Sequence, residues 1–536
     1  MKQICLNWTV SLLTGFFVLF LLSSFGFVFN LPINSFYLPI AVFAGVFLSI
    51  YLTFKQNRKG CIKSIFAQFI VFFDFILVSS LLCYFIPDVS YDGTTYHQAM
   101  IILLKLGLNP IFDNVRDFAI NQEYVFTSSI PYVENFLKFF EIIGANIYLY
   151  LNKIELTKVT NYIFMLAAFC YSFYTLKNFN LNNFKSLMFA SILIYNPVCI
   201  CQMLSNYVDA VFYYVFLILL FALINYVKGE DKNFSMPIIL MSSVIFANIK
   251  LTGAFTLIIM LAVFFAVYRS KDLLKVFSIS LVLIILTGIN PYFTNIMKGR
   301  SPFYPVIQDS VLNANREFMI TSYPPGFEKM NRLQKFLFST FAVSKNLSPL
   351  IESEDVPRLK IPFTIDGDDK FIFEDMRLGG FGYFFSGILL VSLFLSMFLR
   401  FKNKDDKKLF FAIISVLIIS ILGNHEAWWS RFIPQFWTLP IFICLFMFLS
   451  EQTADKCVNA AKILIGICFL NSLIINVQYF SYIVDAAIVN REFIKVASKS
   501  KILEVPANLP VQLHKYETMP VKLAEYGIKV IYKDEN

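Results

Sequence analysis

The chain has 536 residues, of which 57% are hydrophobic and only 15% are charged, and its formal net charge is +9. This composition is far more apolar than a soluble protein tolerates, which excludes a soluble enzyme. The basic residues stand in short clusters between apolar runs, where they orient a membrane protein, so we expect no nucleic-acid partner.

Apolar runs of membrane-spanning length follow one another along most of the chain. They are about 15 to 23 residues long, which suits helices, whereas a β-barrel would show alternating segments of about 10 residues. We therefore expect an all-α polytopic membrane protein with about 13 transmembrane helices. The expected spans are 8–29, 35–54, 64–86, 156–177, 184–202, 207–227, 235–249, 251–268, 275–291, 379–400, 409–423, 434–450 and 462–484. No signal-peptide cleavage site follows the first run, so we expect it to remain as a helix.

Clusters of lysine and arginine in the short loops predict the orientation. They follow the second, eighth and tenth runs: Lys55, Arg58, Lys59 and Lys63; Arg269, Lys271 and Lys275; Arg400, Lys402, Lys404, Lys407 and Lys408. All fall on one side, which the positive-inside rule assigns to the cytoplasm. We therefore expect an integral, multi-pass protein of the cell (inner) membrane, with a cytoplasmic N-terminus and an exterior C-terminus.

The same count places most extramembrane mass on the exterior side. It predicts a transmembrane domain, 1–484, with exterior loops 87–155 and 292–378, and a C-terminal exterior tail, 485–536. This topology requires that the runs on either side of Lys250 are separate spans. A merged or re-entrant arrangement there would reverse everything downstream, and the basic cluster at 400–408 argues against that reversal.

Local patterns refine the first loop and the tail. Residues 94–106 and 132–143 carry apolar residues at helical spacing and end at Gly107 and Gly144, which predicts helices lying in the membrane interface. In the tail, Val521 to Tyr526 predict a short helix, Gly527 a turn and Ile528 to Tyr532 a strand. The tail is thus expected to be a small α/β unit.

The first exterior loop begins with a concentration of reactive side chains. The stretch from Pro87 to Gln98 contains Asp88, Asp92, Tyr96 and His97, just where a span leaves the membrane. A carboxylate at the edge of low dielectric is a stronger base than one in water, and a neighbouring imidazole can position an acceptor. The alternative is that both aspartates only cap the interfacial helix.

Here the sequence resembles a known family. The run Tyr91-Asp92-Gly93-Thr94-Thr95-Tyr96-His97, followed by Gly107-Leu108-Asn109-Pro110, is similar to the Asp-x-x-x-Tyr-His and Gly-x-x-x-Pro pattern of the GT-C superfamily. These are polyprenyl-phosphate-dependent glycosyltransferases, and the bacterial members of the aminoarabinose- and mannosyl-transferase kind are the most similar. The resemblance implies a GT-C fold in which Asp92 is the catalytic acidic residue, supported by Asp88 and His97.

Further fragments fit the same resemblance, which extends from about residue 64 to 450. They are Asn196-Pro197 with Gln202 and Tyr207-Val208-Asp209, Asn290-Pro291-Tyr292 with Pro302-Phe303-Tyr304-Pro305, and Trp429-Ser430-Arg431-Phe432-Ile433-Pro434. Each lies at an expected exterior end of a span. Tyr207 and Asp209 are therefore further candidates for the site.

The resemblance implies a polyprenyl-phosphate-linked sugar as donor and a lipid or cell-envelope glycan as acceptor. Cations near the membrane surface should then hold the donor phosphate, and arginine can grip phosphate bidentately. The candidates are Arg431, Arg377, Lys298 and Arg300. Arg431 ranks first, because its short exterior turn, with His425 and Glu426, is where the positive-inside rule disfavours a cation. Lys298 and Arg300 fit lipid-headgroup anchors equally well.

Two other features leave alternatives open. Loop 292–378 holds the acidic run Asp366, Asp368, Asp369, Glu374 and Asp375. The loop could close over a substrate as a lid, or the residues from Asp366 to Asp369 could bind a divalent cation, the one cofactor that the sequence suggests. The alternative is a solvated acidic turn. No nucleotide-binding glycine pattern accompanies them, so direct use of ATP is not expected. Asp74 lies within the third span, where a charge costs a few kcal/mol, so we expect it to face protein or water beside a partner.

Three functions remain at this point. The first is inverting transfer of a sugar from a polyprenyl-phosphate donor, with Asp92 as general base. The second is a transporter or flippase for a lipid-linked glycan, which Asp74 would suit, although transporters usually place polar residues at mid-bilayer and show internal repeats. The third is a glycan polymerase or ligase.

Overall fold

The computed structural model describes residues 1–56, 60–122, 130–304, 323–346, 356–450, 453–506 and 518–533. Within these ranges the chain is mostly helical, with two small pairs of parallel strands. Eight helices are long and apolar enough to cross a membrane, so the protein is a polytopic, membrane-embedded helical protein. Arg58, Lys59, Pro305 and parts of loops 87–155 and 292–378 lie outside the described residues.

The eight long helices carry most of the expected spans. They are α1 (Lys2–Val28), α2 (Tyr37–Gln56), α3 (Cys61–Phe85), α8 (Val159–Asn178) with the 3-10 turn η2 (Ile154–Lys158) before it, α11 (Asp209–Val227), α12 (Lys232–Ile249), α13 (Leu251–Tyr268) and α21 (Asp455–Ser500). A ninth candidate is α14 (Lys271–Thr287), after which the π turn η3 (Ile289–Phe293) and α15 (Thr294–Met297) bend away by 81°.

The remaining expected spans fall on helices that are shorter than a full span or, in one case, start with a turn of charged residues. They are α9 (Asn183–Ile194), α18 (Phe385–Ser396), α19 (Lys404–Gly423), and α20 (Thr438–Leu449) with the turn η6 (Pro434–Trp437) before it. For 184–202 the cause is local. Pro197 disfavours helical geometry at Asn196, so the helix ends at Ile194 and the four-residue helix α10 (Pro197–Ile200) starts anew.

Short elements make up the segments between and after the spans. They are η1 (Gly93–His97), α4 (Gln98–Lys105), α5 (Val115–Asn121), α6 (Ile130–Asn135), α7 (Phe139–Leu151), η4 (Phe327–Lys329), α17 (Arg332–Phe341), β1 (Lys345–Asn346), β2 (Lys370–Phe371), η5 (Ser430–Phe432), β3 (Ile502–Pro506), α22 (Met519–Ala524) and β4 (Lys529–Lys533).

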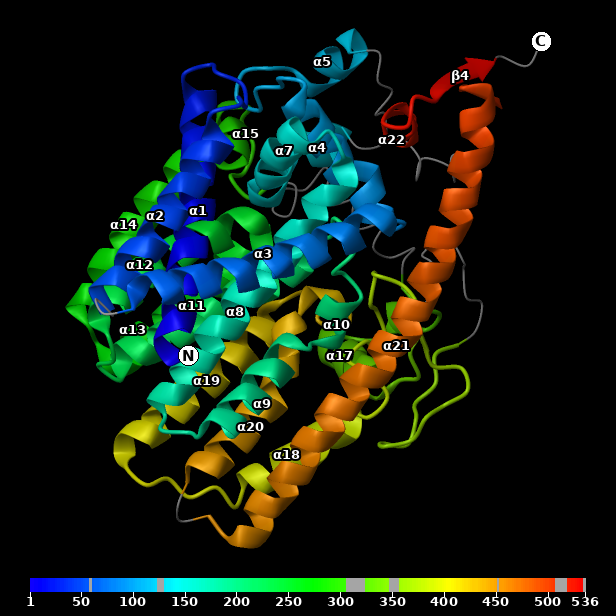
Figure 1. The fold of residues 1–536 in the computed structure, drawn as a ribbon. Helices are drawn as coiled ribbons and strands as arrows, with labels where there is room; N and C mark the ends of the chain where they lie inside the picture. Colours follow the sequence, from blue (N-terminus) through cyan, green and yellow to red (C-terminus); the bar gives the residue numbers. More distant parts are fainter. Residues whose placement is uncertain are drawn as a thin grey trace.

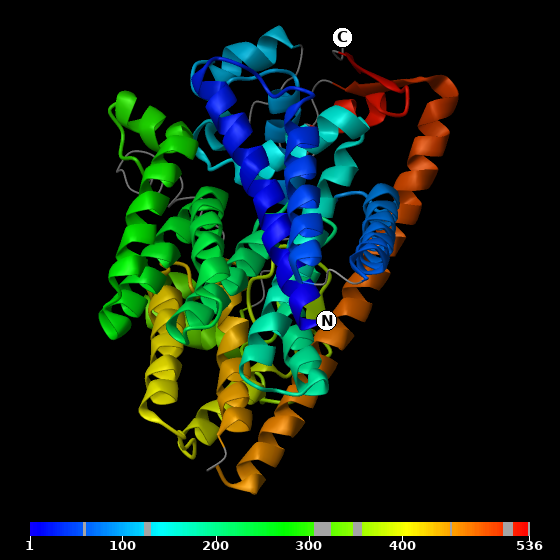
Figure 2. The same ribbon diagram turned by 60° about the vertical axis from the view of Figure 1, so that its left-hand side comes forward.

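The core of the molecule surrounds α11. In this helix 94% of the apolar window is buried, and it packs against α8 and α12 (Figure 1). A helix that is apolar on every side is stable only when other helices enclose it. By contrast, α3 lies on the flank near α21, and only 6% of its window is buried (Figure 2).

The turn at Lys250 separates two antiparallel spans. Lys250 Nζ lies 2.6 Å from Asp209 Oδ1 at the first residue of α11, while Ser270 Oγ, after α13, lies 2.6 Å from Tyr226 Oη at the last turn of α11. The chain therefore travels the length of α11 between residues 250 and 270. This excludes the merged arrangement of α12 and α13.

The first large loop differs from its expected form. Gly107, with φ of +108°, ends α4 as predicted, but α4 is buried on every side from Gln98 to Leu104 and presents no face to an interface. The expected helix 132–143 is instead two helices, because α6 stops at Asn135 and α7 begins at Phe139 and continues through Gly144. Gly144 allows α4 and α7 to pack closely, since a Cβ there would lie 2.9 Å from Ile101 Cδ1.

The tail forms the expected helix, turn and strand. Gly527 takes φ of +73° between α22 and β4, and β4 pairs in parallel with β3 over five residue pairs. Helix α21 crosses the expected boundary at 484 and extends to Ser500, carrying this unit beside the first large loop (Figure 1).

Asp74 lies on a helix that other helices barely cover. Its side chain is exposed on α3, and within the described residues it forms no hydrogen bond or ion pair. The expected partner is therefore not found among the described residues, while the expectation that Asp74 faces protein or water stays a prediction.

Candidate functional site

The motif loop, residues 87–98, is held from inside by Asp88. Its Oδ1 accepts hydrogen bonds from the backbone N–H of Ser90 at 2.9 Å and from the Ser90 hydroxyl at 2.5 Å, and its Oδ2 accepts one from the N–H of Asn206 at 2.7 Å. Burial raises the pKa of this carboxyl, although Lys522 and Lys158 oppose the shift. Asp88 thus joins the loop to the turn before α11.

Asp92 points to a different partner. Its Oδ2 lies 2.7 Å from Nη1 of Arg431, a residue 339 positions later in the chain. Both side chains are largely buried, with 14% and 10% of their surfaces exposed. The structure therefore joins two candidate residues from opposite ends of the sequence pattern.

Two further carboxylates surround the same guanidinium. Arg431 Nε lies 2.9 Å from Asp375 Oδ1, and its Nη1 lies 3.8 Å from Asp209 Oδ2. Burial opposes the positive charge, but Asp375 and Asp92 outweigh it and hold the pKa of Arg431 above its ordinary value. The same attraction, from Arg431 and then Arg377, overcomes burial and lowers the pKa of Asp375.

Backbone pairing brings Asp375 to this place. The N–H of Arg431 donates to the carbonyl of Met376 at 3.0 Å, and the N–H of Ser430 donates to the carbonyl of Arg377 at 3.1 Å. The Ser430 hydroxyl also donates to that carbonyl, at 2.7 Å. The end of loop 292–378 and the turn η5 are therefore fastened side by side.

Two more cations complete the cluster. Lys250 lies 2.6 Å from Asp209, and Arg377 Nη2 lies 3.0 Å from Asp375 Oδ2. Three cations thus balance three aspartates. We call Asp92, Asp209, Lys250, Asp375, Arg377 and Arg431 the charged cluster.

Gln202 ties this cluster to the span ends. Its Nε2 donates to Asp209 Oδ2 at 3.2 Å and to the carbonyl of Glu374 at 3.2 Å, while its Oε1 accepts from the N–H of Ala210 at 3.1 Å. The sequence analysis noted Gln202 only as part of a fragment. Lys250 was considered only for topology and Asp375 only within the acidic run, so neither was proposed for this site.

Aromatic rings enclose the guanidinium. The centre of the Arg431 guanidinium lies 4.9 Å from the ring of Tyr207, 5.0 Å from that of Phe432 and 5.3 Å from that of Trp429. Such rings exclude water and favour a cation at their faces. Burial, and then the nearby Asp92, raise the pKa of Tyr96 and of Tyr207, so both phenols stay protonated and can donate hydrogen bonds.

His97 faces away from this cluster. Its Nδ1 forms a short hydrogen bond with Glu141 on α7, and its ring lies 4.3 Å from that of Tyr96. Among the described residues it has no ion pair with Asp92 or Arg431. His97 and Asp88 therefore position the loop in this structure, while Asp92 is the loop residue that contacts Arg431.

The other candidate residues lie apart from Arg431. Arg300 donates to Asn135 Oδ1 at 3.4 Å, and Lys298 is exposed after α15. His425 has 75% of its side chain exposed and lies 2.7 Å from Glu426, whose other oxygen accepts from Trp428 Nε1. These four residues are not brought together with the charged cluster.

The acidic run in loop 292–378 is neutralised by basic side chains. Arg358 lies 2.6 Å from Asp366 and 2.8 Å from Asp368, and Lys360 lies 3.1 Å from Asp369. Among the described residues, no group of three or more histidine, cysteine, aspartate or glutamate side chains has an arrangement that could hold a metal ion.

Comparison with known proteins identified no relative. No family model, no curated protein and no solved structure matches the chain.

Proposed function

We propose that the protein is a membrane glycosyltransferase, which moves a sugar from a polyprenyl-phosphate-linked donor to a lipid or cell-envelope glycan acceptor. The observation that carries this proposal is the 2.7 Å contact of Asp92 with Arg431. A base and an anion-binding residue in one buried site are what transfer from a phosphate leaving group requires. The GT-C resemblance of the motif loop supports the same function.

In the proposed reaction, Arg431 binds the donor phosphate and Asp92 is the general base. The acceptor oxygen attacks the anomeric carbon while its proton passes to Asp92. The bond between that carbon and the phosphate oxygen breaks, and polyprenyl phosphate leaves with the electron pair. Attack opposite to the leaving group inverts the anomeric centre.

The ion pair between the two residues supplies a means of ordering these events. An arriving phosphate competes with Asp92 for Nη1 of Arg431, because both are anions that accept from the same donor. The released carboxylate then faces the acceptor. Asp375 keeps Arg431 in place through its own contact at 2.9 Å.

Transfer by purified protein tests the role of Asp92. With a panel of labelled polyprenyl-phosphate sugars, Asp92→Asn should lower the rate by about 100-fold or more, because general-base catalysis contributes on the order of 10²–10⁴. Asp272→Asn is the matched control, since Asp272 is an exposed carboxylate at the start of α14, at the opposite end of α12 and α13 from Lys250. Undiminished transfer by Asp92→Asn rules out the base.

Arg431→Lys tests the phosphate site while retaining the positive charge. We expect a rise in KM for the donor together with a fall in kcat, because lysine cannot bind phosphate bidentately. If wild type consumed no donor, and vesicles containing it moved a lipid-linked glycan between leaflets, the transporter function would replace this proposal.

The proposal also includes the orientation, with the N-terminus in the cytoplasm and the charged cluster at the exterior face. Asp117 in α5 is exposed, and Cys457 is the one native cysteine that is not buried. Asp117→Cys in a Cys457→Ser background should react with an impermeant maleimide added outside, and protection there would reverse the topology.

A further inference from the structure

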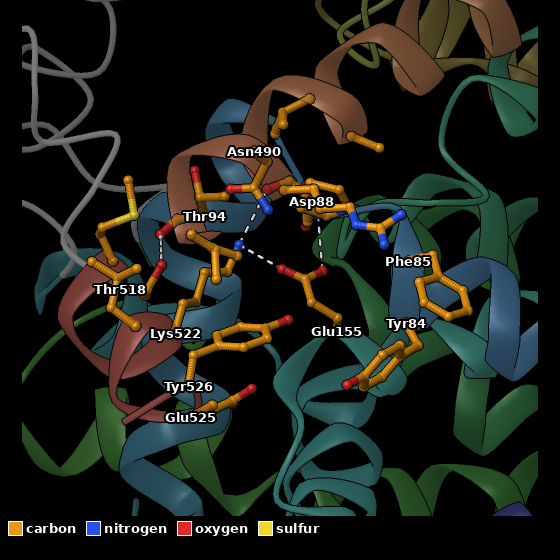
Figure 3. A pocket seen from close by; sticks show the side chains of 17 residues that line it. Tyr84, Phe85, Asp88, Thr94, Glu155, Asn490, Thr518, Lys522, Glu525 and Tyr526 are labelled. Atoms are coloured by element: carbon orange, nitrogen blue, oxygen red, sulfur yellow. Dashed lines mark hydrogen bonds and ion pairs between the residues drawn. The ribbon is translucent and has the colours of Figure 1, made fainter. Parts of the chain in front are cut away.

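A cavity borders the motif loop, and no residue of the charged cluster lines it. Its volume is about 340 Å³, and its walls come from the end of α3, from α21 and from α22 (Figure 3). This size suits a small molecule or a lipid headgroup. Helix α21 contributes Ala487, Asn490, Arg491 and Ile494, whose spacing places them on one face.

The basic side chains around the cavity are paired, with one exception. Lys522 lies 2.7 Å from Glu155 and donates to the carbonyl of Asp88 at 3.1 Å (Figure 3). Glu155 also lies 2.5 Å from Lys158, outside the cavity. Arg491 lines the same cavity and forms no ion pair or hydrogen bond within the described residues. Its positive charge is therefore available to a ligand.

The remaining wall is apolar and belongs to the membrane-facing surface. Phe85 and Tyr84 end α3 with 62% and 38% of their surfaces exposed. The rest of α3 is an apolar helix that is barely covered. A ligand bound by Arg491 therefore has a hydrocarbon-compatible surface beside it, which a soluble anion would not use.

We propose that this cavity binds the phosphate headgroup of a membrane lipid, with Arg491 on the phosphate and the lipid chain against Phe85 and Tyr84. Asn490 Nδ2 is a second donor on the same helix face. The inference is independent of the proposed glycosyl transfer, because it concerns binding and not the reaction at Asp92. Since Asp88, Val89 and Thr94 also line the cavity, a bound lipid would rest against the motif loop.

Equilibrium binding to the purified full chain in neutral detergent tests this site. The probe is radiolabelled hexadecyl phosphate, with inorganic phosphate and hexadecanol as competitors. We expect saturable binding that neither competitor displaces at tenfold higher concentration, because the site needs both the charge and the chain. Displacement by inorganic phosphate would make it a plain anion site, and displacement by hexadecanol a detergent-like groove, and each overturns the inference.

Variants locate the binding. Arg491→Gln should weaken it by about 10-fold or more, since a hydrogen-bonded charge contributes about 1.5–3 kcal/mol. Ala487→Trp, which fills the cavity from the same face, should do likewise. Lys495→Gln, one turn further along α21 and paired with Glu492 outside the cavity, should bind as wild type. Unchanged binding by Arg491→Gln contradicts the site.

Discussion

Gly93 lies directly against the carboxylate of Asp88, so that a Cβ atom on Gly93 would overlap Asp88 Oδ2 and the hydroxyl of Ser90. Those two groups hold the motif loop together, and they cannot move without losing their hydrogen bonds. We therefore expect Gly93→Ala to destabilise the protein by about 1–3 kcal/mol, the usual effect of overpacking a close contact. The thermal unfolding midpoint in detergent measures it.

Gly466→Ala is the control for this substitution. Gly466 lies within α21, and no atom lies within 4 Å of the position of its Cβ. Alanine should be neutral there or should stabilise the helix by up to about 1 kcal/mol. A Gly93→Ala protein with an unchanged midpoint would show that the loop accommodates a side chain.

Substitutions of Lys250 and of Asp209, which form an ion pair, should have non-additive effects on the free energy of unfolding. Removing Lys250 leaves a carboxylate with 3% of its side chain exposed, and a buried charge without its partner costs about 3–5 kcal/mol. Lys250→Met should therefore lower the unfolding midpoint more than the double variant Lys250→Met, Asp209→Asn. A double-mutant cycle measures the coupling, which we expect to be about 1–3 kcal/mol, and strictly additive effects would contradict it.

Lys138 should make stability depend on pH. Burial lowers the pKa of this ammonium to about 7 from an ordinary value of 10.5, although Glu141 and Glu134 oppose the shift. The folded state therefore binds fewer protons than the unfolded state between these values, so the free energy of unfolding should rise as pH increases from about 7 towards 10.5. Lys138→Met should remove this rise, which midpoints at several pH values measure. Lys271→Met, at an exposed lysine at the start of α14, is the control and should retain it.

The tail should hold the motif loop in place. The hydroxyl of Thr518, just before α22, donates to the carbonyl of Thr94 at 3.1 Å and contacts Gln98 Oε1 at 3.2 Å. Thr518→Val removes both bonds at nearly constant volume. We expect faster amide hydrogen exchange in residues 87–98, measured by mass spectrometry, because local opening depends on such contacts. Lys529→Ala, on exposed β4, should leave that exchange unchanged.

The helices could be predicted because a lipid-facing or buried span is apolar throughout, a property of local composition. Each expected apolar run falls on a helix, including both runs beside Lys250. The lengths were less predictable. The Asn196-Pro197 step ends α9 early, although the apolar run continues beyond it. Charged residues form the first turn of α19, so its apolar part is shorter than the helix.

Four of the six residues of the charged cluster were site candidates from the sequence: Asp92, Asp209, Arg377 and Arg431. Asp92 and Arg431 are each anomalous in their own surroundings, one as a carboxylate at a span end and the other as a cation where cations are rare. Asp375 and Lys250 look ordinary locally. Their positions come from the pairing of residues 376–377 with 430–431 and from the turn at Lys250, which are tertiary features.

In the first loop, by contrast, two residues that the sequence marks as site candidates lie outside the charged cluster. Asp88 and His97 share the local signature of Asp92, yet they bind Ser90, Asn206 and Glu141. Nothing in a loop sequence tells which of two neighbouring carboxylates turns inward. The docking of Thr518 on Thr94, 424 residues apart, is equally invisible in the sequence.

The length of helix α21 sets the position of Arg491 and of the C-terminal tail relative to the motif loop. Its 46 residues extend for about 69 Å, more than twice the roughly 30 Å of a bilayer's hydrocarbon core. Each residue of an α-helix advances the chain by about 1.5 Å and turns it by about 100°. The phase of this one helix therefore decides whether Arg491 and the tail face the loop at all. Inserting one residue after Ile483 would turn them away while leaving in place the earlier contacts of α21, such as those of Asn471 with Phe381 and of Tyr479 with Glu374. The number of residues in this helix therefore sets the alignment of two parts of the protein.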